Sequence, residues 1–181
     1  IESTASQALN TGWCPGPATR IELDYALNDL TQQKRLFGVA GNDSTKFNYA
    51  AYINSNGDLT FACGDEWKTV ILTKADKARH TIIADSDKNT VEVLTDGRVV
   101  ASGAITSVRT KKSLFMMALC GAMDNAAGTS VGTSACAMKI YGCKIYEAGE
   151  LVRDFRPMAL SNGVGCLVDA VTGYATYFGK G

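Results

Sequence analysis

The sequence has no excess of either charge, because its 18 lysines and arginines equal its 18 aspartates and glutamates. A protein that binds nucleic acid usually carries a basic patch, and one that binds an anionic membrane surface carries a polybasic cluster. The sequence contains no such cluster. Long hydrophobic runs are also missing, since none approaches the roughly 18 apolar residues that span a bilayer. We therefore expect neither a nucleic-acid partner nor a membrane span.

Motifs for metal and redox chemistry are equally scarce. None of the six cysteines belongs to a C-x-x-C pair, which argues against a thioredoxin motif or a zinc ribbon. The single histidine, His80, would need several further nitrogen or sulfur donors to form a zinc site. An even cysteine count permits disulfides and would fit an exported protein, but the spacing leaves their connectivity open. We interpret most of the cysteines as small buried hydrophobic residues.

Length and composition are those of one ordinary globular domain. The chain has 181 residues, of which 46% are hydrophobic and 20% are charged. A domain of this size can bury a core of its own. The chain begins at Ile1 rather than methionine, so we expect a piece excised from a longer precursor.

The dominant pattern is an alternation of apolar and polar residues, interrupted by turn residues. From Arg20 to Leu27 the apolar side chains share one face, whereas Glu22 and Asp24 lie on the other, as in a half-buried strand. This pattern predicts an all-β sandwich or barrel with at most one helical turn, near 27–33 or 74–78. Further strands are expected at 47–53, 59–63, 69–72, 80–84, 90–94, 98–101, 113–120, 137–147, 150–155 (closed by Pro157) and, as two short pieces, within 163–178.

Several segments carry a more specific signature. They are the opening residues 1–4 and 9–12, the pair 80–82 and 91–98 ending in Asp96-Gly97, and the tail 144–157, 163–169 and 172–173. Together these segments resemble a bacterial and phage family of LamG-like, concanavalin A-like domains. The resemblance spans nearly the whole chain. It implies one jelly-roll sandwich of two curved antiparallel sheets over residues 1–181.

The resemblance also implies a setting and a range of activities. Its members are exported or surface proteins, and the domain is often one module of a longer polypeptide. Members and relatives bind glycans or proteins, and a minority of the superfamily hydrolyses glycans. In the tail we expect Arg153, Asp154 and Asp169 to hold the fold, through a salt bridge, backbone hydrogen bonds and a turn cap.

Two patterns that could carry catalysis are incomplete. Glu22 and Asp24 lie on one face of a strand, about 7 Å apart, but the glycan-cleaving relatives use Glu-x-Asp-x-Glu and the third position here is Ala26. Residues 128–132 fit the nucleophile-elbow pattern around Ser130, yet that motif needs a later histidine and His80 precedes it. We therefore predict no catalytic residue.

Calcium is the one cofactor that we expect as an option. Residues 85–89 resemble the first half of a calcium loop, but Thr90 stands where glycine is required and Asp96 where glutamate is, so a hairpin turn is the preferred interpretation. Calcium is common among LamG-like relatives. The candidate ligands in predicted loops are Asp43, Asp65 and Asp124.

Aromatic side chains are the expected contacts for a sugar, because sugar C–H faces stack on aromatic rings. Trp67 follows two acids in a predicted loop, so its ring could stack while the carboxylates accept hydrogen bonds from hydroxyls. The predicted ligand-binding residues are Trp67, Asp65, Glu66, Tyr49 and Tyr52. Trp13 is a further candidate, and both tryptophans have the alternative interpretation of core residues.

Three hypotheses for function follow. The leading one is a non-catalytic binding or adhesion module, with a glycan or a cell-surface protein as its partner, located outside the cell. The second is a glycoside hydrolase or lyase with a divergent active site. The third is a structural protein-interaction domain within a larger surface protein.

Overall fold

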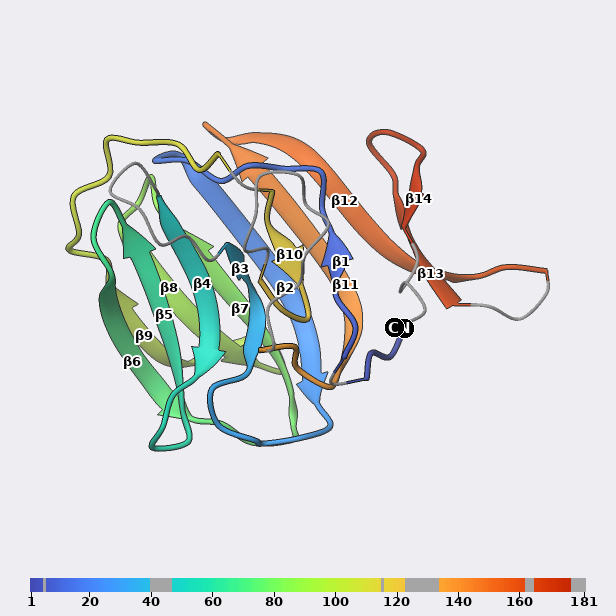
Figure 1. Ribbon diagram of the computed structural model, residues 1–181, viewed down its shortest axis with the longest axis horizontal. Coiled ribbons are helices and arrows are strands. Elements are labelled where there is room, and N and C mark those ends of the chain that lie inside the picture. The colour runs from blue at the N-terminus through green and yellow to red at the C-terminus, as the bar shows by residue number, and fades with distance from the viewer. Residues whose placement is uncertain (5, 40–46, 115, 123–133, 162–164, 177–181) are drawn as a thin grey trace.

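Two antiparallel sheets contain the regular structure of the computed structural model (Figure 1). The structure describes residues 1–4, 6–39, 47–114, 116–122, 134–161 and 165–176. Within those residues there are 14 strands and no helix, so the expected helical turn is absent from both predicted places. No helix of the described chain is long and apolar enough to cross a membrane.

One sheet has six strands and the other has eight. In spatial order, the six-stranded sheet contains β1 (Leu9–Asn10), β10 (Ala118–Leu119), β3 (Arg35–Val39), β4 (Asn48–Ile53), β5 (Asp58–Gly64) and β6 (Lys68–Lys74). The eight-stranded sheet contains β14 (Ala175–Thr176), β13 (Gly165–Asp169), β12 (Glu150–Ala159), β11 (Met138–Glu147), β2 (Thr19–Leu27), β7 (Arg79–Asp85), β8 (Thr90–Thr95) and β9 (Arg98–Ala104).

The core lies between the two sheets and is aromatic at its centre. Ile21, Leu23 and Tyr25 of β2 are buried on the side that faces the six-stranded sheet. From that sheet, the Tyr49 and Phe61 rings meet edge to face with their centroids 5.2 Å apart. Burying a side chain of this size stabilises the fold by roughly 1.5–3 kcal/mol. Because strand residues alternate between faces, Arg20, Glu22 and Asp24 of β2 point away from the six-stranded sheet.

Some predicted boundaries are wrong. Among the described residues of 113–120, only Ala118–Leu119 form a strand. Pro157 does not close its strand, because β12 continues to Ala159. The pairing of β12 with β11 extends only to Phe155, and beyond that point β12 pairs with β13 alone. Proline has no N–H to donate, but Pro157 has no β11 residue opposite it, so no hydrogen bond to β11 is lost.

The tail residues hold the fold as predicted. Asp169 accepts hydrogen bonds from the Asp154 and Val171 backbone N–H groups at 2.9 and 3.1 Å. It also accepts one from the Thr172 hydroxyl at 2.7 Å. Arg153 Nε lies 3.5 Å from Asp169 Oδ2, and the same guanidinium donates to the carbonyls of Thr11 and Gly12. The β13–β14 turn and the N-terminal segment are thereby fixed to β12.

Candidate functional site

Three adjoining depressions follow β2 on the outer face of the eight-stranded sheet. Their volumes are about 350, 430 and 190 Å³. The first and second share Glu22, and the second and third share Asp24 and Thr81. Outward residues on a strand are about 7 Å apart, so one shallow path leads from Arg20 past both acids. We call it the β2 groove; its side chains are Arg20, Glu22, Asp24, Arg79, His80, Thr81, Asp85, Asp87, Lys88, Leu94, Asp96, Tyr141, Lys144, Tyr146, Asp154 and Arg156.

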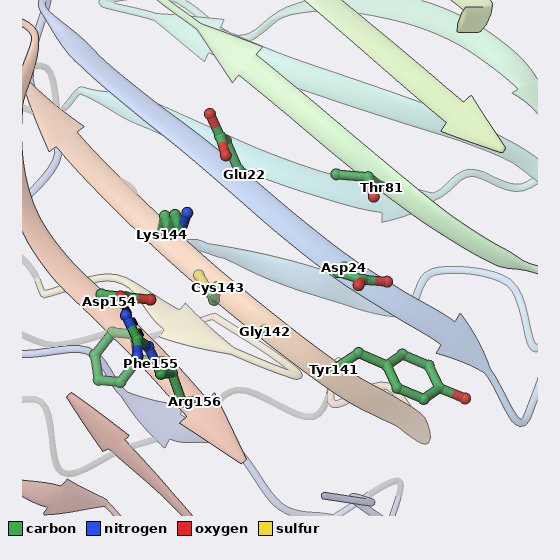
Figure 2. A pocket seen from close by; sticks show the side chains of 10 residues that line it. All are labelled: Glu22, Asp24, Thr81, Tyr141, Gly142, Cys143, Lys144, Asp154, Phe155 and Arg156. Atoms are coloured by element: carbon green, nitrogen blue, oxygen red, sulfur yellow. Dashed lines mark hydrogen bonds and ion pairs between the residues drawn. The ribbon is translucent and has the colours of Figure 1, made fainter. Parts of the chain in front are cut away.

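The central depression is formed by four neighbouring strands, β7, β2, β11 and β12 (Figure 2). Strand register places Lys144 of β11 directly between Glu22 of β2 and Asp154 of β12. Gly142 lies opposite Asp24, so the floor at that point is backbone. A Cβ added at Gly142 would meet one atom within 4 Å, the Phe155 carbonyl oxygen at 3.8 Å. The depression is therefore open above this glycine.

Each carboxylate of the central depression is held by its own arginine. Arg20 Nη2 donates to Glu22 Oε1 at 2.5 Å. Arg79 binds both oxygens of Asp24, with Nε–Oδ1 at 2.9 Å and Nη2–Oδ2 at 2.6 Å.

Asp154 completes the set. Arg156 donates from Nε and Nη2 to Asp154 Oδ2 at 3.0 and 2.5 Å. The hydrogen bonds with Asp24 and Asp154 raise the pKa values of Arg79 and Arg156, which keeps both guanidinium groups charged. Lys144, in contrast, makes no hydrogen bond or ion pair with any residue that the structure describes.

Two tyrosines line the groove, each with an arginine over its ring: Tyr146 in the first depression and Tyr141 in the central one. The Arg20 guanidinium carbon is 5.3 Å from the Tyr146 ring centroid, and that of Arg79 is 4.2 Å from the Tyr141 centroid. Cation–π contacts of this kind hold a ring in place. Tyr141 is 41% exposed, so part of its ring is available to a ligand.

The predicted acid pair therefore lies in the groove, together with a third carboxylate that sequence reasoning gave only a structural role. That third acid is Asp154, which comes from β12 and not from the Glu-x-Asp strand. Ala26, at the position of the missing acid, is buried. Asp154, Lys144 and Tyr141 all lie more than 100 residues from β2 in the sequence, so their meeting depends on the pairing of β2 with β11.

Trp67 and Tyr52 form a second surface feature, on the six-stranded sheet. Trp67 lies in the turn between β5 and β6 and is 45% exposed. Its ring centroid is 5.7 Å from that of Tyr52 and 5.8 Å from the Arg35 guanidinium carbon. Burial raises the pKa of the Tyr52 hydroxyl, although Trp67 and Arg35 both act to lower it. These three residues form what we call the aromatic platform.

The two acids beside Trp67 differ in their availability. Both oxygens of Asp65 accept hydrogen bonds from the 110–111 segment, the shortest from the Thr110 hydroxyl at 2.6 Å. Burial acts to raise the pKa of Asp65, but these hydrogen bonds outweigh it and hold that pKa below its ordinary value. Glu66 is exposed and lies 3.8 Å from the Lys68 ammonium group. Asp65 thus anchors a loop, whereas Glu66 is open to a ligand.

Tyr49 corrects one prediction, because it is fully buried and cannot contact a sugar. Its hydroxyl donates to the Ala84 carbonyl oxygen at 2.7 Å and lies 3.3 Å from the Thr19 carbonyl oxygen, which ties β4 to the opposite sheet. Burial raises the pKa of this hydroxyl well above its ordinary value. Tyr49 shares a face with Ala51 and Ile53, and all three are core residues.

The structure gives no support to the calcium and nucleophile candidates among the residues that it describes. Asp43, Asp124 and Ser130 lie outside the described residues. Within the described ranges, no group of three or more His, Cys, Asp or Glu side chains could hold a metal ion. Asp85 Oδ1 accepts from the Lys88 N–H at 3.0 Å, as in the expected hairpin turn. His80 lies between the Thr95 hydroxyl and Asp76 Oδ1, each at 2.8 Å.

Comparison with known proteins shows the fold. No family model matches the chain, and no curated protein matches it. Among solved structures, a SAP-like pentraxin from Limulus polyphemus is 8% identical and covers 81% of this chain and 71% of its own, with a TM-score of 0.55. The chain has the concanavalin A-like jelly-roll fold. This confirms the predicted LamG-like, concanavalin A-like architecture, whereas the bacterial or phage type stays a prediction.

Two further structures overlap less well. The carbohydrate-binding module CBM40 of the Ruminococcus gnavus IT-sialidase, solved with α2,3-sialyllactose, is 15% identical and covers 68% of this chain and 75% of its own, with a TM-score of 0.45. Domains LG4-5 of the mouse laminin α1 chain are 11% identical, with a TM-score of 0.45. That match covers 84% of this chain and 44% of the laminin chain.

Proposed function

We propose that the domain is a non-catalytic binding module that takes an extended carbohydrate chain in the β2 groove. The observation that carries the proposal is that three depressions adjoin along β2 and share Glu22 and Asp24 as lining residues. Two of the depressions exceed 300 Å³, which is about the lower limit for small-ligand sites. A row of such sites suits an oligomer better than a single small molecule.

The chemistry of the groove supports a sugar ligand. A hydroxyl group donates one hydrogen bond and accepts others. Carboxylate acceptors and cationic donors alternate across the strands, as in the row Asp154, Lys144 and Glu22. The exposed ring of Tyr141 adds an apolar surface on which a sugar can stack.

The pairing of each acid with an arginine supports the proposal that the module is not catalytic. Glycosidases use two carboxyl groups, about 5–5.5 Å apart in retaining enzymes and about 6.5–9.5 Å apart in inverting ones, and one of the two carries a proton to give. Glu22 and Asp24 are alternate strand residues about 7 Å apart, a spacing that fits only the inverting type. They and Asp154 already accept hydrogen bonds from Arg20, Arg79 and Arg156, so the groove is arranged to hold a ligand rather than to protonate one.

The test is a panel of soluble polysaccharides run in affinity electrophoresis, with reducing ends assayed afterwards. We expect the wild type to be retained by at least one polysaccharide and to release no reducing ends. Gly142→Leu should weaken that retention at least tenfold, because the added side chain fills the central depression without a backbone clash. Retention of neither wild type nor variant by any polysaccharide would contradict the proposal.

The aromatic platform is the second candidate surface for the same function. Trp67 is half-exposed beside Tyr52, and Glu66 can accept hydroxyl hydrogen bonds next to it. Trp67→Ala is therefore the matched variant in the panel. We expect it to be retained like the wild type; loss of retention in Trp67→Ala with normal retention of Gly142→Leu would move the site to the platform.

We further propose that the domain acts outside the cell, where polysaccharides are the accessible partners. Fractionation of the source cells tests this. Recovery in the medium or surface fraction is expected, and recovery in the cytosolic fraction alone would contradict it.

A further inference from the structure

We propose that the β2 groove selects an anionic carbohydrate and binds the acidic group of one sugar between Lys144 and Arg156. This inference rests on the proposed function and adds the class of ligand. Its starting point is Lys144, the cation that strand register places between two carboxylates. Paired strands are about 4.8 Å apart, so a lysine in this position would ordinarily bridge its neighbours.

The carboxylates beside Lys144 have other partners. Glu22 is bound by Arg20, and Asp154 accepts two hydrogen bonds from Arg156. Lys144 is exposed and makes no hydrogen bond or ion pair to any residue of the described ranges. In Figure 2 its side chain stands up from β11 within the pocket. Its ammonium group is therefore free to meet a ligand.

The local charges leave this cation unbalanced. The acids of the central depression are Glu22, Asp24 and Asp154, and each is paired with one arginine. One positive charge remains in the central depression, that of Lys144. In the two outer depressions Asp85, Asp87 and Asp96 outnumber Lys88, so the acidic group fits in the central depression alone. A neutral sugar would leave the charge of Lys144 without a counter-charge, whereas a carboxylate or sulfate group would supply one through a charge-assisted hydrogen bond.

The shape of the pocket gives the acidic group a place. Gly142 leaves the floor open. Gly142 and Arg156 line the same depression, and Gly142 lies two residues before Lys144 on β11. Arg156 uses Nε and Nη2 for Asp154, and an arginine has five N–H donors in all. An anionic group above Gly142 can thus meet Lys144 on one side and the remaining donors of Arg156 on the other. Asp24, across the same glycine, is neutralised by Arg79.

The experiment measures the affinity of the whole domain for three polymers by isothermal titration calorimetry. They are a polyuronate, a sulfated glucan and a neutral glucan. We expect at least one anionic polymer to bind at least tenfold more tightly than the neutral glucan. Comparison of the polyuronate with the sulfated glucan shows whether a carboxylate or a sulfate group is preferred. Binding to the anionic polymer should weaken as salt is added, because the ion pair is screened.

Two variants assign the effect to one side chain. Lys144→Gln should lower affinity for the preferred anionic polymer about tenfold, whereas Lys144→Arg should keep most of it. Lys68→Gln removes the same charge from β6 in the other sheet and should change nothing. Thermal unfolding checks that all three variants fold, which is expected because Lys144 is an exposed side chain.

The outcomes separate this inference from the proposed function. Equal affinity of wild type and Lys144→Gln for the anionic polymer would overturn the assignment to Lys144. Neutral glucan bound as tightly as the anionic polymers would overturn the anionic specificity and leave the proposed function standing. Binding of none of the three would count against both.

Discussion

Arg79 donates two hydrogen bonds to the Asp24 carboxylate, and its guanidinium carbon lies 4.2 Å from the Tyr141 ring centroid. One arginine thus fixes an acceptor of the β2 groove and an aromatic ring of its rim, from two different strands. Asp24 belongs to β2 and Tyr141 to β11. The relationship links strand register directly to the geometry of the candidate site.

Arg79→Ala should therefore affect binding more than stability. The Arg79 side chain is largely exposed, and exposed ion pairs contribute little to stability. We expect the free energy of unfolding in urea to stay close to that of the wild type and the affinity for the retained polysaccharide to fall severalfold. A large loss of stability, or unchanged affinity, would contradict the role assigned to this arginine.

Asp169→Ala should destabilise the fold strongly. The substitution leaves the Asp154 and Val171 N–H groups without their acceptor and removes the carboxylate that forms an ion pair with Arg153. Breaking a buried network of this kind costs roughly 3 kcal/mol. Urea unfolding measures the loss, with Glu150→Gln at the exposed start of β12 as the control. A loss no larger than that of the control would show that the tail is not fixed by this carboxylate.

The same carboxylate should make stability depend on pH in the acid range. Burial acts to raise the pKa of Asp169, but the hydrogen bonds from Asp154, Thr172 and Val171 outweigh it, so the folded-state pKa lies below the ordinary 3.8. A depressed folded pKa gives stability that is present above the unfolded value and lost as pH falls through the folded one.

The measurement is urea unfolding at pH 5 and at pH 3. We expect the wild type to lose stability between the two, and Asp169→Asn to lose less because it has no proton to take up there. Equal losses in both proteins would contradict the assignment. Asp65, whose pKa is also depressed, accounts for part of the loss that remains in the variant.

The cysteines should be reduced and mostly unreactive in the native protein. All six are free, five of them buried and Cys14 half-buried. Burial raises the pKa of Cys120 and of Cys136 to about 12, so little thiolate forms near neutral pH.

Thiol titration at pH 8 under native conditions should therefore detect at most one reactive group, Cys14. After unfolding in denaturant without reductant, the same titration should detect all six thiols. Fewer than six would reveal a disulfide and contradict the arrangement described above.

The sequence predicted strands best where one face of the strand is buried and the other is exposed to solvent. The alternation from Arg20 to Leu27 gave β2 within one residue. Positive φ angles at Gly57, Asp96 and Gly97 agree with the expected hairpin turns. β3 was missed because four of its five residues are buried, so it shows no alternation. The run from 113 to 120 looked like a buried strand, yet Leu114 is exposed.

The candidate site was only half predictable. Glu22 and Asp24 were recognised as a pair on one strand face, because alternation alone gives that. Lys144, Asp154 and Tyr141 required the long-range register of β2, β11 and β12, including the bulge between Ile140 and Gly142. Tyr49 could have been excluded from sequence, since it shares a strand face with Ala51 and Ile53.

The central claim is that a carbohydrate chain binds along β2 on the outer face of the eight-stranded sheet. An NMR titration of the ¹⁵N-labelled domain with an oligosaccharide from the retained polysaccharide tests it most directly. The account predicts that the largest amide shift changes cluster at Glu22, Asp24, Thr81, Tyr141, Gly142 and Lys144, which line one depression. Shift changes confined to Tyr52 and Trp67, or scattered without saturation, would contradict it.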